Sequence, residues 1–105
     1  MFEERERGYE AKWAHDAEAL FRIMARRDIA LGGWAAARMN LSAGDTADYI
    51  DAVIQAGMLG KGADPALDKI RGDLKARGAG CPDDELKVKA DDLLAEAEAY
   101  FGAPV

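Results

Sequence analysis

The sequence predicts an all-α protein, a small four-helix bundle preceded by a mobile, partly helical N-terminal arm. Apolar residues recur at helical spacing along most of the chain, and the alternation typical of β-strands appears nowhere in it. Short glycine-containing connectors separate the helical segments. At 105 residues the chain is long enough for one domain with a modest core.

The first helical pattern begins as one narrow apolar stripe, which occupies about 60° of a helical wheel. The stripe consists of Phe2, Tyr9, Trp13, Leu20, Met24 and Leu31. Gly8 interrupts its early part at a cost of about 1 kcal/mol relative to alanine, and no capping residue precedes Phe2. We therefore expect residues 1–15 to form an arm that is mobile in the free protein and becomes helical on a partner.

From about Asp16 the apolar pattern widens, and we expect a bundle domain over residues 16–105. Its first helix ends near Met39, where Asn40 is a typical C-terminal stop. The core positions predicted on this helix are Leu20, Phe21, Met24, Leu31, Trp34 and Ala35. Trp34 could instead line a ligand cavity, but a tryptophan on an apolar helix face is usually part of the core.

Local signals delimit three further helices. Ser42 or Asp45 can cap the second helix, which we expect to end at Gly57. The third has Asp64 as its cap and Pro65 as its first residue. Gly78 then ends the third helix, and the acids that follow Pro82 suit the positive end of a fourth. The buried positions predicted on these helices are Tyr49, Ile50, Val53, Ile54, Leu67, Ile70, Leu74, Leu86, Ala90, Leu93, Leu94, Ala97 and Phe101.

Charge and composition argue against several classes of protein. The net charge of −6 disfavours nucleic-acid binding, which needs clustered cations. Residues 1–28 hold seven acids and six bases, so the acidity lies mainly in the body. No apolar run approaches the roughly 18 residues of a membrane span, which disfavours direct membrane insertion and predicts a cytoplasmic or peripheral protein. A membrane-surface helix is disfavoured by the acids that flank the stripe.

No catalytic constellation is evident in the sequence, and we predict that the chain is not an enzyme. His15, Ser42 and Cys81 are each the single residue of their type, and no motif brings them together. As the single cysteine, Cys81 has no partner for an intramolecular disulfide, and its place between Gly80 and Pro82 disfavours a metal site. His15 could sense pH near neutrality, although a surface histidine is the commoner case.

Arginines in the first helix leave a second hypothesis open. Arg22 and Arg26 share a helix face and could make a weak contact with a nucleotide such as ATP or ADP. A solvated face is the commoner arrangement, in which these residues and Arg27 pair with Glu18 and Asp28. No cofactor is predicted, and a small helical nucleotide-binding or nucleotide-sensing module is the alternative function.

Several motifs together carry a resemblance that covers essentially the whole chain. The most specific is the start, FEERERGYEAKWAHDAE at residues 2–18. ARRD at 25–28, LGGWAA at 31–36 and the pattern L-x-K-I-R-x-D-L at 67–74 follow in order. In these features the sequence resembles the zeta subunit of the alphaproteobacterial F-type ATP synthase. Departures are small, with Gly8 and Trp13 at positions that bear on inhibitory strength rather than on its type.

The resemblance implies a regulatory inhibitor of ATP hydrolysis. In that family the helical body attaches to the catalytic head, and the N-terminal segment enters a catalytic interface between α and β subunits beside the γ rotor. The partners implied are therefore the α, β and γ subunits, with the chain a monomer when free and peripheral to the inner membrane. The residues themselves agree with a partner-binding arm. Its predicted contacts are Phe2, Arg5, Arg7, Tyr9, Lys12 and Trp13. The stripe could alternatively pack on the bundle or self-associate as a coiled coil.

Overall fold

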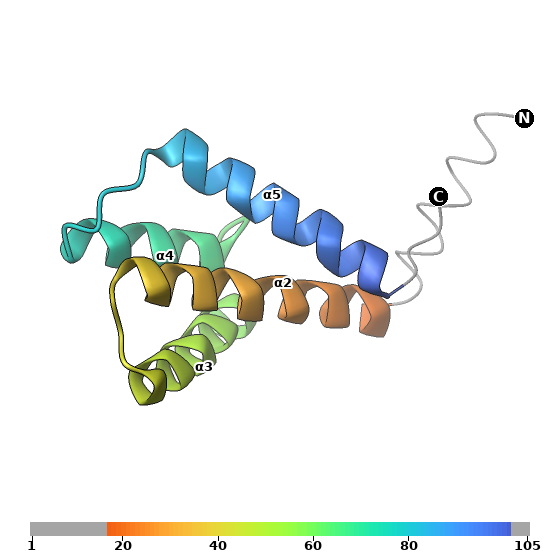
Figure 1. The fold of residues 1–105 in the computed structure, drawn as a ribbon. Coiled ribbons are helices and arrows are strands. Elements are labelled where there is room, and N and C mark those ends of the chain that lie inside the picture. Colours follow the sequence, from red (N-terminus) through yellow and green to blue (C-terminus); the bar gives the residue numbers. More distant parts are fainter. Residues whose placement is uncertain (1–16, 102–105) are drawn as a thin grey trace, which may run out of the picture.

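A computed structural model describes residues 17–101, which contain four α-helices and no strand. Their bounds are α2 Ala17–Arg38, α3 Ala43–Leu59, α4 Pro65–Ala76 and α5 Asp83–Tyr100 (Figure 1). The predicted all-α four-helix fold is confirmed for this part of the chain. The arm predicted over residues 1–15 lies outside the described residues.

Helix α2 is the central element of the bundle. It runs antiparallel to α3 and α5 and contacts each of the other three helices (Figure 1). Helix α4 is the shortest, with 12 residues against 22 in α2. Figure 1 shows that α4 accompanies only the C-terminal part of α2, so that the start of α2 and the end of α5 project together beyond it.

Local capping chemistry explains where the helices begin. The Ser42 hydroxyl accepts a hydrogen bond from the Asp45 amide, and the Asp64 carboxylate accepts one from the Leu67 amide. Pro65 occupies the first turn of α4, as predicted. Helix α5 follows Pro82 and places acids in its first turn, where the helix dipole favours them.

Two helices end in the same hydrogen-bonded turn. After α2, Asn40 adopts φ 58°, and after α4, Gly78 adopts φ 63°. In both turns the next amide reaches back to the last helical turn, from Leu41 to the Ala36 carbonyl and from Ala79 to the Leu74 carbonyl. These are the bonds of the Schellman motif, so the predicted stops at Asn40 and Gly78 are confirmed.

The core lies where all four helices meet. Leu31, Val53, Ile70 and Leu86 are fully buried and come one from each helix. The other buried positions among those predicted are Ala35, Leu67, Leu74, Ala90, Leu93 and Ala97. Trp34 and Tyr49 are half-buried and pack against this cluster. Ile50, Ile54 and Leu94 are half-buried as well.

Four residues predicted to be buried are exposed. Leu20, Phe21 and Met24 lie on the projecting part of α2, and Phe101 follows the end of α5. Their helical spacing is that of a core face, but α3 ends at Leu59 and α4 begins only at Pro65, so neither helix covers this end of the bundle. The prediction was wrong because periodicity identifies an apolar face and does not tell how far the neighbouring helix extends.

The predicted end of α3 at Gly57 was also wrong. The helix continues to Leu59 and ends at Gly60, whose amide donates to the Ala56 carbonyl. Gly57 instead lies inside the helix, where α3 approaches α2. A Cβ at this position would lie 2.7 Å from the Oδ2 atom of Asp28, so the glycine provides space for a carboxylate of the other helix.

Candidate functional site

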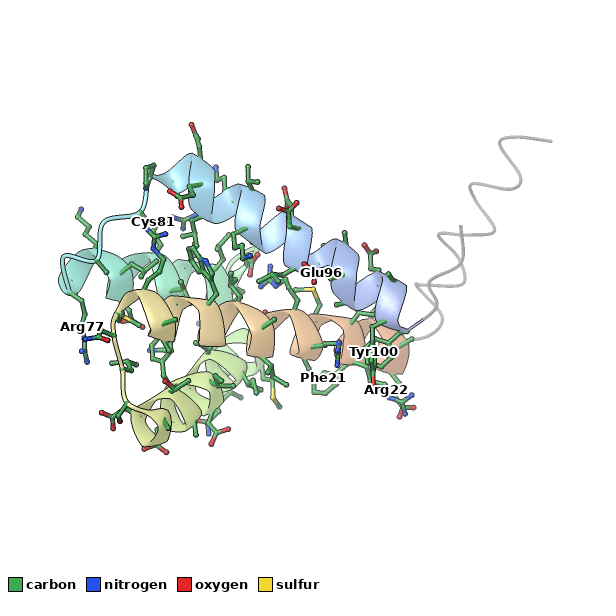
Figure 2. All side chains as sticks on the ribbon, in the orientation of Figure 1. Phe21, Arg22, Arg77, Cys81, Glu96 and Tyr100 are labelled. Carbon is green, nitrogen blue, oxygen red and sulfur yellow. The ribbon has the colours of Figure 1, made fainter. Side chains whose placement is uncertain are left out.

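The residues predicted to bind a partner, Phe2, Arg5, Arg7, Tyr9, Lys12 and Trp13, lie outside the described residues, as does His15. These residues precede Ala17 in the sequence, where α2 begins at the projecting end of the bundle. Figure 2 shows Phe21, Arg22 and Tyr100 at this end, and Arg77 and Cys81 at the opposite one.

The two arginines suggested for a nucleotide contact already have partners. The Arg22 guanidinium bonds the Glu18 carboxylate at 2.7 Å, and both side chains are mostly exposed. The Arg26 guanidinium lies 3.4 Å from the centre of the Tyr100 ring, as a cation–π contact between α2 and α5. A nucleotide contact at these residues stays a prediction.

Beside Arg26 a surface groove of about 580 Å³ runs between α2 and α5. Arg26 and Glu96 are its charged lining residues, and the others include Ile29, Leu93 and Tyr100. Polyphosphate binding needs several converging cations or backbone amides. This groove offers one cation, already stacked on a ring, together with a carboxylate.

Arg27 and Asp28 form a buried charged cluster with Asp64, which the sequence did not suggest. Arg27 is 3% exposed and Asp28 is 5% exposed. The Arg27 Nε and Nη2 atoms bond Asp28 Oδ1 at 2.9 and 2.7 Å. Its Nη1 and Nη2 atoms bond the two Asp64 oxygens at 2.7 and 2.8 Å, in bidentate geometry. The expectation of a solvated face is therefore wrong for Arg27 and Asp28, although Arg22 and Glu18 fit it.

The three groups of the cluster shift one another's pKa values. Burial alone would lower the pKa of Arg27, but the hydrogen bonds that Arg27 donates to Asp64 and Asp28 outweigh burial and raise that pKa. Burial raises the pKa of Asp28, against the opposing effect of Arg27. The pKa of Asp64 is lowered, first by its hydrogen bonds from Arg27 and further by the Leu67 amide that it caps.

Sequence spacing gave only a partial signal for this cluster. The sequence predicts Asp64 as a helix cap and shows Arg27 and Asp28 as neighbouring charged residues. Adjacent residues on a helix do not face each other, and Asp64 lies 37 positions from Arg27. Only the packing of α4 against α2 brings the three side chains together.

On the other side of α2, a hollow of about 320 Å³ opens between α2 and α3. Phe21 and Met24 line it from α2, and Met58 lines it from the last turn of α3. The exposed fractions of these side chains are 53%, 37% and 58%, in that order. The remaining lining residues are Ala25, Asp28, Ile54 and Gly57. The hollow is thus an apolar surface with one carboxylate, Asp28, which Arg27 already binds.

A third hollow, of about 460 Å³, lies at the opposite end, between α4 and the start of α5. Cys81 lines it together with Arg71, Lys75 and Leu86. Burial raises the pKa of the Cys81 thiol, so the group is protonated near neutral pH and is a poor nucleophile. Arg71 is held by Asp83 and Asp68, at 2.5 and 2.7 Å.

Within residues 17–101 no helix is both long enough and apolar enough to span a membrane. The same residues contain no group of three or more histidine, cysteine or acidic side chains arranged to hold a metal ion.

Comparison with protein families gives a match over residues 1–100, to the model of the ATPase inhibitor subunit zeta. The chain belongs to this zeta family. The match spans the arm as well as the described body, and it confirms the membership that the sequence motifs suggested. A family of inhibitor subunits is also consistent with a chain that is not itself an enzyme. Comparison with curated proteins and with solved structures gives no match.

Proposed function

We propose that this zeta-family chain inhibits ATP hydrolysis by the F-type ATP synthase through residues 1–15. In this proposal the arm becomes helical and enters a catalytic interface between α and β subunits beside the γ rotor. Residues 16–105 form the body that carries it. The chain acts as a monomer at the cytoplasmic face of the inner membrane, where it is peripheral through the synthase.

The observation that carries the proposal is the family match, which includes the arm. The predicted anchors are Tyr9 and Trp13, because large aromatic side chains dominate the binding energy of many interfaces. Phe2 extends the same stripe. A separable arm is supported by the described core, whose buried residues run from Ile23 to Ala97 and come from all four helices α2, α3, α4 and α5.

Deletion of residues 1–14 tests the proposal. The deletion removes the predicted anchors and keeps every buried residue of the described core. We expect the shortened chain to melt at nearly the same temperature as the full chain and to lose inhibition of ATP hydrolysis by the isolated catalytic head. Melting is followed by circular dichroism, and hydrolysis is measured at equal inhibitor concentrations.

Point variants in the arm refine this test. Tyr9→Ala and Trp13→Ala should each weaken binding by about 1–3 kcal/mol. Lys12→Ala should mainly alter the association rate and its salt dependence. Inhibition by the shortened chain at the level of the full chain would disprove the proposed role of the arm, and failure of that chain to fold would show a structural role instead. Submicromolar ATP or ADP binding, lost in Arg22→Ala and Arg26→Ala, would favour the nucleotide-sensing alternative.

A further inference from the structure

An apolar surface lies at the projecting end of the body, where the start of α2 meets the end of α3. We define the α2–α3 face as Leu20, Phe21, Met24 and Met58 together with the hollow between them. Leu20 is 40% exposed, and the other three side chains are 37–58% exposed. Large apolar groups that gather in one exposed place on a soluble protein commonly mark an interaction site.

The shape and charge of the hollow favour an apolar occupant. Ala25 and Gly57 leave space at its base, and Ile54 adds an aliphatic wall. Asp28 is the charged residue that lines the hollow. Arg27 donates two hydrogen bonds to its Oδ1 atom and so offsets its negative charge. Met24 and Met58 at the rim are flexible and adapt to the shape of a partner side chain.

The position of the face along α2 indicates which partner covers it. Leu20 and Met24 continue the stripe of Tyr9 and Trp13 within the same arc of about 60°. On a continuous helix, Leu20 lies only about 10 Å further along the axis than Trp13, at about 1.5 Å per residue. A partner surface that holds Trp13 therefore lies within reach of the α2–α3 face.

We propose that the α2–α3 face is the second half of the inhibitory interface and that the partner which binds the arm also covers it. Resting on the proposed function, this inference extends it from the arm onto the body, with an apolar side chain of the catalytic head entering the hollow beside Met58. Because Met58 lies on α3, its contribution is independent of how well residues 1–16 form a helix.

Charge introduced on this face tests the inference. Met58→Glu and Phe21→Glu in the full chain should each raise the concentration needed for half-inhibition of the catalytic head at least about 10-fold, because they place a carboxylate in an apolar contact. Val88→Glu is the matched control, since Val88 is 59% exposed and lies on α5, away from the hollow. All three variants should keep the melting temperature of the parent chain, because the replaced side chains are exposed.

The outcomes separate this inference from the proposed function. If deletion of residues 1–14 abolishes inhibition while Met58→Glu and Phe21→Glu inhibit like the parent chain, the partner does not cover the face and only the inference fails. If the deletion leaves inhibition intact, the proposed function fails as well.

Two other occupants would each overturn the inference. If the parent chain sediments as a dimer and Met58→Glu sediments as a monomer, a second copy of the chain covers the face. A lower melting temperature for Met58→Glu in the full chain, but not in the shortened one, would show that the chain's own arm covers it. We expect a monomer and no such difference.

Discussion

Arg27 ties the middle of α2 to the beginning of α4 through Asp64, and Asp64 also caps α4. One carboxylate therefore contributes to the start of a helix and to its docking on another helix. The Tyr49 hydroxyl has a comparable role between α3 and α4, where it donates to Asp73 at 2.8 Å. Burial and the Asp73 carboxylate raise the pKa of Tyr49, so the phenol stays protonated.

Removal of the cation from the buried cluster should be strongly destabilising. Arg27→Met keeps an unbranched side chain but leaves the buried carboxylate of Asp28 without its partner, at a cost of about 3–5 kcal/mol. The matched control is Arg22→Met, which loses only an exposed pair and should change stability by no more than about 0.5 kcal/mol. Urea unfolding followed by circular dichroism measures both. Equal losses would contradict the role assigned to the cluster.

The charge of Asp64 should also appear in the pH dependence of stability. Its lowered pKa means that its charge stabilises the fold above its ordinary pKa of 3.8, and that this stability is lost as pH falls through the lowered value. Asp64→Asn keeps a good capping residue, but it removes the charge and one of the two oxygens that accept from Arg27. The parent chain should thus be more stable than Asp64→Asn at pH 7, and the difference should shrink below about pH 4. A difference that is constant with pH would show that the charge is not the cause.

At the scale of helices, the close approach of α3 to α2 depends on one glycine. Gly57 lies inside α3, where glycine costs about 1 kcal/mol relative to alanine. The cost is offset because the site has no room for a Cβ beside Asp28, whose carboxylate Arg27 holds in place. The same glycine forms part of the hollow of the α2–α3 face.

Replacement of two helical glycines should give effects of opposite sign. Gly57→Ala should destabilise the protein by about 1–3 kcal/mol, since its methyl group forces Asp28 or α3 to move. Gly72→Ala in α4, where a Cβ would meet no atom within 4 Å, should stabilise it by about 0.5–1 kcal/mol. Chemical unfolding of the two variants measures the difference. Stabilisation by both changes would show that α3 is free to move away from α2.

Helix ends were easier to predict than helix environments. Ser42, Asp64, Asn40 and Gly78 act through bonds to residues three to five positions away, so local sequence was sufficient. The exposure of Phe21 depends instead on where α3 ends beside it, which the local sequence around Phe21 does not encode. The pairing of Arg27 with Asp64 was missed for the same reason, because these two side chains meet only when the helices pack together.

For the whole molecule, stability should be uneven along α2. Residues 31–36 of that helix lie among the other helices, whereas residues 20–24 lie on the projecting end. In the chain that lacks residues 1–14, amides of residues 21–25 should therefore exchange faster with solvent than those of residues 31–36. NMR-detected hydrogen exchange measures both. Equal protection would mean that α2 opens only when the whole bundle unfolds.

The family and the fold class were predictable from the sequence, because the motifs and the helical periodicity extend along the chain. The α2–α3 face was not, since Leu20, Phe21 and Met24 have the spacing of core residues. Their exposure is a property of the assembled bundle. The predicted arm contacts, which lie outside the described residues, stay predictions.

In mechanical terms, α2 is a rod of 22 residues, about 33 Å long, that runs along the bundle. A force applied at Ala17 acts about 15 Å along the helix from Arg27, where the ion pair with Asp64 holds α2 to α4. Within the described residues, the part of α2 before Arg27 contacts the end of α5 through Arg26 and Tyr100, and it contacts the end of α3. In the proposed complex, a rotor that pushes on residues 1–15 would therefore bend the part of α2 before Arg27 first, while the core keeps its packing.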